Sequence, residues 1–168
     1  MIDNKTLKWL SEKQVILDQF IQNKWNFKND KTLLDKKITA FLVELGEYAN
    51  EERSFKYWSN KKPSDLEIQL DEYIDGIHFI ISVGNQINYN FEQFNYNFLN
   101  KDSIIDIYFE IISCLNSFIV DNNNNINYSK LLNAFLNICE IKNYNQDQII
   151  NAYNIKNEIN FQRQNNNY

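Results

Sequence analysis

The residues in this sequence that are best suited to chemistry are four carboxylates arranged in two pairs. Glu44 and Glu47 lie in the stretch FLVELGEYANE, and Glu72 and Asp75 lie in LDEYIDGIHF. Each pair has an i, i+3 spacing, which places both side chains on one side of a helix, about one turn apart. Carboxylate oxygens are the ligands that hard divalent cations such as Mg²⁺ prefer. The spacing therefore predicts a divalent metal site between two helices.

The two helices that carry these carboxylates are apolar on more than one side. On a helical wheel, Phe41 and Leu45 lie on one stripe of the first helix, while Val43 lies on another. In the second helix, Ile68 and Phe79 lie opposite the main apolar stripe. A helix that is apolar on most sides is expected to be buried. Because buried carboxylates cost free energy unless a cation neutralises them, this pattern strengthens the prediction of a metal site.

The composition favours a single all-α domain spanning residues 1–168. The chain contains only 3 Gly and 1 Pro, whereas 43% of its residues are hydrophobic and 15% are aromatic. Such a chain is poor in tight turns and is expected to form long helices with short polar joints. The net charge of -5 argues against a partner that is a nucleic acid polymer. No apolar stretch reaches the ~20 residues of a membrane span, and no N-terminal signal region is seen, so we expect a cytoplasmic protein.

Hydrophobic periodicity predicts a bundle of about six helices and no sheet. We expect Ser64 and Glu67 to form a capping box at the start of the third helix. Residues 85–100 alternate polar and aromatic side chains and are interpreted as a loop packed by its own aromatic rings, while 121–125 form a polar linker. The expected helices cover residues 6–24, 31–53, 65–84, 101–120, 129–141 and 147–164.

Three further stretches carry polar residues that could bind a ligand. Gln14 lies within an otherwise apolar helical stripe, either as a boundary residue that reaches water or as an amide that hydrogen-bonds a ligand. Lys56 and Trp58 precede the only proline; they could offer a nucleotide a cation and a ring, or belong to a solvated surface. Near the C-terminus, donors recur at helical spacing, either as a phosphate site or as a polar tail: Tyr153, Lys156, Asn157, Asn160 and Arg163.

The order and spacing of these blocks resemble the all-α nucleoside triphosphate pyrophosphatases, a superfamily that includes MazG-like proteins and the dimeric dUTPases. The stretches VELGEYANEERSFKYWSNKKPS, DEYIDGIHFIIS and AYNIKNEINFQRQ are similar to those of the dimeric dUTPases, as is Gln14 followed by Leu17 and Asp18. The resemblance covers nearly the whole chain. It implies Mg²⁺-dependent hydrolysis of dUTP to dUMP and pyrophosphate, with dUDP as a further candidate substrate. The alternatives are a related pyrophosphatase that prefers dCTP or a non-canonical nucleotide, and a helical interaction protein without activity.

The resemblance also implies roles for individual residues. The ligands of two to three Mg²⁺ ions would be Glu44, Glu47, Glu72 and Asp75, with Glu47 activating the attacking water. The pocket for uracil and deoxyribose would be formed by Gln14, Trp58 and His78, with Asn157 near the base or sugar. The phosphates would be approached by Lys56, Lys156, Asn160, Arg163 and Tyr168. The family typically forms homodimers in which one subunit can complete the other's pocket, and it typically has glycine where this chain has Asn167.

Overall fold

The computed structural model describes residues 2–122 and 124–166. Over these residues the chain forms six α-helices, one short 3-10 helix and no strand, which confirms the expected all-α bundle. The elements are α1 (Asn4–Trp25), α2 (Lys31–Glu52), α3 (Leu66–Gln86), η1 (Phe91–Gln93), α4 (Ile104–Val120), α5 (Asn125–Lys142) and α6 (Gln146–Asn165). None of these helices is long and apolar enough to cross a membrane.

One expected helix start and one expected helix cap were wrong. Helix α5 begins four residues before Ser129, because the side chain of Asn124 accepts hydrogen bonds from the free backbone N–H groups of Ile126 and Asn127. The expected capping box at the start of α3 does not form. The hydroxyl of Ser64 donates instead to Glu51, and the N-cap residue of α3 makes no side-chain cap. The Ser64 contact ties the start of α3 to the end of α2, across the loop that joins them.

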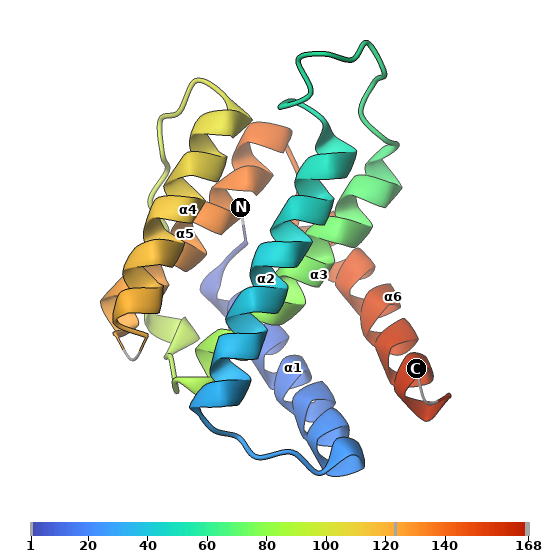
Figure 1. The fold of residues 1–168 in the computed structure, drawn as a ribbon, viewed down its shortest axis with the longest axis vertical. Helices are drawn as coiled ribbons and strands as arrows, with labels where there is room; N and C mark the ends of the chain where they lie inside the picture. Colours follow the sequence, from blue (N-terminus) through green and yellow to red (C-terminus); the bar gives the residue numbers. More distant parts are fainter. Residues whose placement is uncertain (1, 123, 167–168) are drawn as a thin grey trace.

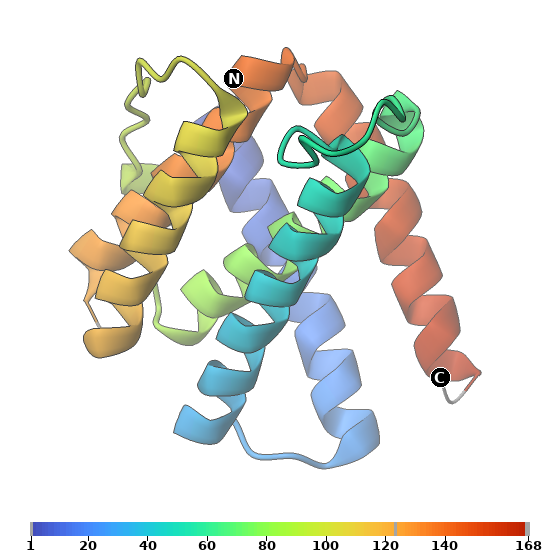
Figure 2. The same ribbon diagram turned by 45° about the horizontal axis from the view of Figure 1, so that its top comes forward.

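Helix α3 is the central helix of the bundle (Figure 1). It packs most extensively along α2, and it also contacts α1 and α6. Helices α4 and α5 form a second pair, which lies on one side of α2 and α3. Helix α6 lies on the opposite side of α2 and α3 in both views (Figure 2). Aromatic rings join the two pairs: Tyr73 of α3 stacks on Phe135 of α5 with ring centroids 4.8 Å apart, and Phe41 of α2 meets Phe135 edge-on. Such pairs add to the free energy gained from burying their area.

The expectation that α2 and α3 are buried on most sides was only partly correct. Their main stripes are buried, including Phe41 and Leu45, but about half of the surface of Val43 (51%) and Ile68 (47%) is exposed. Leu42 and Leu66 are similarly exposed. Helices α2 and α3 therefore present apolar side chains that the described part of the chain leaves about half exposed.

Buried polar contacts fasten the end of α2 to the α4–α5 pair. Glu52 is 2% exposed, and its carboxylate accepts hydrogen bonds from Lys142 at 3.0 Å and from Ser54. The hydroxyl of Tyr108 also reaches it, at 3.3 Å. Burial acts to raise the pKa of Glu52, but the hydrogen bonds from Ser54 and Lys142 outweigh it and hold that pKa below the usual value. The charge at the end of α2 is thus fully satisfied.

The segment between α3 and α4 is largely a loop, as expected, with η1 inside it. Its aromatic residues Phe91 and Phe94 are buried in the core. Two amides of α5 also hold it, because Asn133 and Asn137 both donate to the carbonyl of Asn97, and Asn137 accepts from the backbone N–H of Leu99. The aromatic residues and these amides together fix the loop.

The glycines of α2 and α3 give a matched test of this packing. A Cβ atom on Gly84 would lie 2.6 Å from a ring atom of Phe91 and would also collide with Tyr128, whereas one on Gly46 would meet nothing within 4 Å. We expect Gly84→Ala to destabilise the protein by about 1–3 kcal/mol through overpacking. Gly46→Ala should instead stabilise it by up to about 1 kcal/mol through helix propensity. Urea unfolding measures both, and equal stability of the two variants would contradict the close packing at Gly84.

Candidate active site

Three of the four expected metal ligands converge between α2 and α3. Glu44, Glu72 and Asp75 each offer a carboxylate oxygen, and these oxygens lie within 4.8 Å of one another. Glu47 lies one turn along α2 from Glu44 and is exposed, so its carboxylate stands outside this group. Its charge still acts on the cluster, because it raises the pKa of Glu44. Helices α2 and α3 pack side by side along their lengths, and this packing brings the two acidic pairs together.

The cluster is short of positive charge. Burial and the nearby carboxylates of Asp75, Glu47 and Glu72 raise the pKa of Glu44 to about 7. Burial, followed by the charge of Asp75, also raises the pKa of Glu72. Burial raises the pKa of Asp75 as well, although a lysine opposes the shift. Carboxylates that resist ionisation in this way favour a site for a cation.

The lysine beside the cluster is Lys156 of α6. Its ammonium lies 2.5 Å from a carboxylate oxygen of Asp75 and 2.8 Å from one of Asp71, and its side chain is 5% exposed. Burial acts to lower the pKa of Lys156, but its contacts with Asp71 and Asp75 outweigh burial and raise that pKa. Lys156 therefore remains charged and lies at the boundary between the carboxylates and the adjoining pocket.

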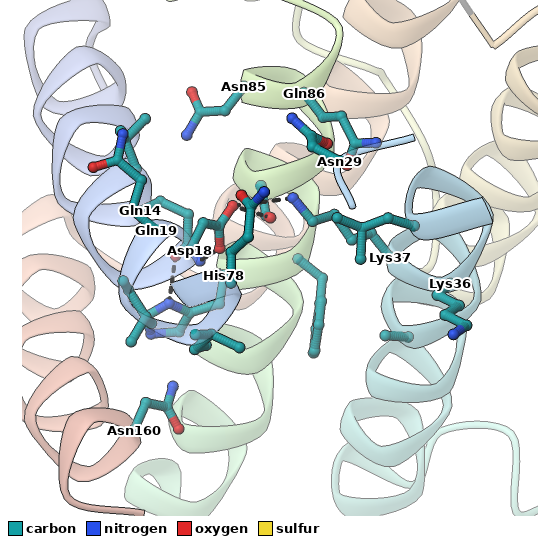
Figure 3. A pocket seen from close by; sticks show the side chains of 18 of the residues that line it. Gln14, Asp18, Gln19, Asn29, Lys36, Lys37, His78, Asn85, Gln86 and Asn160 are labelled. Carbon is teal, nitrogen blue, oxygen red and sulfur yellow. Dashed lines mark hydrogen bonds and ion pairs between the residues drawn. The ribbon is translucent and has the colours of Figure 1, made fainter. Parts of the chain in front are cut away.

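A pocket of about 600 Å³ opens next to the cluster, between α1, α2, α3 and α6. Glu44 and Asp75 line one part of it, and Gln14 and His78 line another. Polar side chains from all four helices point into the space between them (Figure 3). Apolar surface, including Phe79, completes the lining. The groups that line the pocket near Gln14 and His78 are uncharged apart from the ion pair of Asp18 and Lys37 and the nearby Lys36. A cavity of this size, with carboxylates at one end and His78 and Gln14 at the other, can hold a nucleotide.

His78 is held in a neutral state at the uncharged end of the pocket. Its Nδ1 atom lies 2.7 Å from the amide oxygen of Gln14, and its ring stacks on Tyr153 with centroids 4.3 Å apart. Burial, followed by the charge of Lys156, lowers the pKa of His78 to about 3. Its Nε2 atom is buried and has no hydrogen-bond partner among the described residues, and the same holds for the side-chain oxygen of Asn157. Of these two residues, His78 lines the pocket, whereas Asn157 is not among the lining residues.

The other residues expected in the site are divided by the structure. Asn160 and Arg163 of α6 line the pocket. Lys56 and Trp58 do not; they lie in the loop between α2 and α3, where Trp58 is 64% exposed and Lys56 donates a hydrogen bond to the backbone of Asn50. Tyr168, and Asn167 before it, lie outside the described residues.

Sequence reasoning missed several polar residues of the pocket. Asp18 of α1 forms an ion pair at 3.1 Å with Lys37 of α2, and it accepts a hydrogen bond from Ser82 of α3. No individual role was predicted for Asp18, Lys37 or Ser82, because none of them belongs to one of the two acidic pairs. The i, i+4 spacing of Gln14 and Asp18 was the available signal, since it places both side chains on one face of α1.

The comparison with protein families decides the chain's relationship. The sequence model of a family described as dUTPase matches residues 6–168. The chain belongs to the all-helical dUTPase family. Its activity is accordingly that of a dUTP diphosphatase, an enzyme that hydrolyses dUTP. No curated protein gave a match.

Membership of this dUTPase family implies a divalent metal cofactor, and the residues present fit one. The three converging groups are hard oxygen donors, which suit Mg²⁺, Mn²⁺ or Ca²⁺ and not the softer metals that cysteine binds. The raised pKa values of Glu44, Glu72 and Asp75 show that their negative charges are incompletely balanced. Each feature is what a carboxylate site for a divalent cation requires.

Because Glu44 holds its proton up to about pH 7, cation binding by this dUTPase should be coupled to proton release. We expect the affinity for Mg²⁺ or Mn²⁺ to weaken by up to about tenfold per pH unit below pH 7. Calorimetry in two buffers of different ionisation enthalpy measures the released protons. Glu44→Gln should lose this release, whereas Glu67→Gln, at an exposed position in the first turn of α3 and outside the cluster, should keep it. Unchanged proton release in Glu44→Gln would contradict the assignment.

The same raised pKa has a consequence for the metal-free protein. Folding raises the pKa of Glu44 from 4.5 to about 7, so the folded state binds this proton more tightly than the unfolded chain does. The stabilisation from this group is therefore full below about pH 4.5 and is lost as the pH rises through about 7. Cation binding replaces the proton at higher pH.

Proposed function

We propose that this dUTPase hydrolyses dUTP to dUMP and pyrophosphate and requires Mg²⁺. The observation that carries the proposal is the carboxylate cluster at the edge of a nucleotide-sized pocket, in a chain that matches the dUTPase family over residues 6–168. An acidic end of the pocket suits a metal-bound triphosphate, and a largely neutral end suits a nucleoside. The further preference for dUTP over dUDP, dCTP and other nucleotides rests on the family alone.

Glu44, Glu47, Glu72 and Asp75 are the residues that would hold two to three Mg²⁺ ions. Bound there, Mg²⁺ would neutralise phosphate charge and make water a better nucleophile. Glu47 is our candidate for the group that takes the proton from the attacking water, because its carboxylate is exposed and stands apart from the three converging oxygens. This separation would leave one carboxylate oxygen of Glu47 free to face water while its other oxygen and the three converging carboxylates hold the cations.

The phosphates would be contacted from α6. Lys156 carries a charge beside Asp71 and Asp75, and Asn160 and Arg163 line the adjoining pocket. Arg163 already acts on the cluster, since its charge lowers the pKa of Asp75. A guanidinium and an ammonium on one helix face suit the oxygens of a triphosphate. Lys56 and Tyr168 are further candidates for the phosphates.

The nucleoside would occupy the uncharged end of the pocket. The buried acceptors on His78 and Asn157 have no partner among the described residues, and hydroxyl or N–H groups of the base and sugar can supply the missing donors. The amide of Gln14 lies beside His78. Trp58 does not line the pocket of its own chain, so it would complete this end only in the pocket of a second chain.

We propose a homodimer as the working form, because it would supply this second chain. Apolar side chains of α2 and α3 are exposed, and so are the rings of Phe55, Tyr57 and Trp58, which contact one another in the loop that follows α2. Pairing would cover these rings and could bring Trp58 to the partner's pocket. Light scattering should give twice the 20.2 kDa of one chain. A monomer at the concentrations that support full activity would contradict this proposal.

The proposed reaction is tested with purified protein, Mg²⁺ and a panel of dUTP, dUDP, dCTP, dTTP and UTP. We expect dUTP to be hydrolysed fastest, with dUMP and pyrophosphate as the products, and chelation of the metal to abolish activity because the phosphate charge is then unbalanced. Separation of the nucleotides by ion exchange measures rates and products together. Comparable rates on dCTP, dTTP and dUTP would contradict the proposed preference.

The role of Glu47 is tested by Glu47→Gln, which keeps the size of the side chain but cannot accept a proton. We expect kcat at saturating Mg²⁺ to fall by about 10²-fold or more, because general base catalysis contributes on that order. Asp35→Asn, an exposed acidic position on the same helix, is the control and should leave kcat unchanged. If Glu47→Gln kept the wild-type kcat, another group would be the base.

A further inference from the structure

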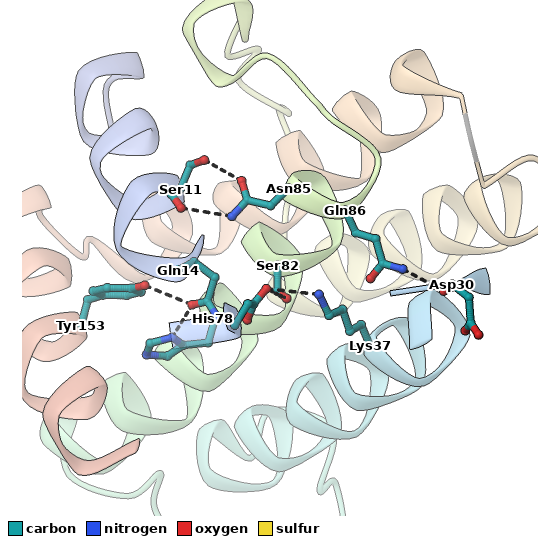
Figure 4. Close-up of polar contacts among 10 residues, drawn as sticks. Ser11, Gln14, Asp30, Lys37, His78, Ser82, Asn85, Gln86 and Tyr153 are labelled. Atoms are coloured by element: carbon teal, nitrogen blue, oxygen red, sulfur yellow. Dashed lines mark hydrogen bonds and ion pairs between the residues drawn. The ribbon is translucent and has the colours of Figure 1, made fainter. Parts of the chain in front are cut away.

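A chain of hydrogen bonds crosses the bundle at the end of the pocket formed by Gln14 and His78 (Figure 4). Lys37 of α2 contacts one carboxylate oxygen of Asp18 at 3.1 Å. The other oxygen of Asp18 accepts from the amide nitrogen of Gln14 at 2.7 Å. The amide oxygen of Gln14 then meets His78 Nδ1 at 2.7 Å and the hydroxyl of Tyr153 at 3.1 Å. Side chains of all four pocket-forming helices take part.

The chemistry of Asp18 determines how the Gln14 amide is oriented. The two ends of an amide have the same shape, but only the NH₂ end donates. A carboxylate can only accept, so the NH₂ group of Gln14 has to face Asp18, and its oxygen has to face His78 and Tyr153. Lys37 and Ser82 both donate to Asp18 as well, so its carboxylate oxygens act as acceptors in every contact of this chain. The orientation of the amide therefore follows from the two acceptor oxygens of Asp18.

The same reasoning extends to the proton on His78. Because the oxygen of Gln14 accepts, Nδ1 of His78 has to carry the proton of the neutral ring. The Nε2 atom is then a bare acceptor, buried and without a partner among the described residues. We propose that Asp18 is a positioning residue that, through Gln14, places the proton of His78 on Nδ1 and keeps Nε2 as an acceptor for a hydroxyl or N–H of the bound nucleotide. The part played by the nucleotide rests on the proposed function; the placement of the proton does not.

Asp18→Asn should reverse the chain. The single oxygen of the new amide should face the ammonium of Lys37, which can only donate, and its NH₂ group then faces Gln14. Gln14 has to turn over, so that its own NH₂ group faces His78 Nδ1. That nitrogen becomes the acceptor, and the proton moves to Nε2. An acceptor toward the ligand is thereby exchanged for a donor, with almost no change in the size of any side chain.

His78 is the only histidine of the chain, so its tautomer can be measured without assigning the spectrum. Two-bond ¹⁵N–¹H correlation spectra of ¹⁵N-labelled protein at neutral pH show which ring nitrogen carries the proton. We expect the proton on Nδ1 in the wild type and on Nε2 in Asp18→Asn. A wild-type ring protonated on Nε2 or on both nitrogens overturns the proposal, even if the variant fails to fold. A folded Asp18→Asn variant that keeps the proton on Nδ1 also overturns it.

Two controls separate this effect from general disturbance of the pocket. Ser82→Ala removes a hydrogen bond to Asp18 but leaves an acceptor in place, so the proton should stay on Nδ1. Glu12→Gln removes an exposed charge from the same helix and should change neither the tautomer nor the activity. For dUTP hydrolysis, we expect Asp18→Asn to lower kcat/KM by about tenfold or more, because a ligand donor would then face another donor. A wild type that shows the Nδ1 proton but no dUTP hydrolysis would refute the proposed function and leave the positioning role intact.

Discussion

The burial of neighbouring carboxylates is the constraint on which the rest of the structure depends. Glu44, Glu72 and Asp75 come together because α2 and α3 pack along each other, and burial is the first cause that raises the pKa of each group. Burial of rings such as Tyr73 and Phe135 supplies free energy that offsets the cost of burying these carboxylates. The protein thus holds the site in shape before the cation binds, which is how a binding site is preorganised.

Helix α6 joins the two chemically different ends of the pocket. Its Lys156 lies in the acidic cluster, and its Tyr153, about one turn earlier, packs on His78 at the uncharged end. Further contacts hold the later turns of α6 against α1, where Phe20 meets Phe161 and the indole of Trp25 donates to Gln164. The position of α6 therefore couples the contacts made to phosphate with those made to the nucleoside. A substitution that loosens α6 is expected to affect both.

The all-α fold was predictable, and so was the convergence of three of the four carboxylates, because both depend on short-range spacing. Scarce Gly and Pro and the helical periodicity indicated long helices, and two acidic pairs at i, i+3 indicated a shared face. The helix ends were harder: Asn124 caps α5 earlier than expected, and Ser64 contacts Glu51 in place of a capping box. Caps depend on which of several nearby side chains wins one backbone group, and propensity alone does not decide that competition.

The sequence by itself determined the helices, the carboxylate pairs and the family to which the chain belongs, since each is written in residue types at fixed local spacing. Only the tertiary structure showed that Lys156 neutralises part of the cluster, that Trp58 lies away from its own chain's pocket, and that Asp18 meets Lys37. These contacts join helices far apart in sequence. They depend on how the helices are oriented about their axes, which is decided by packing of the whole core.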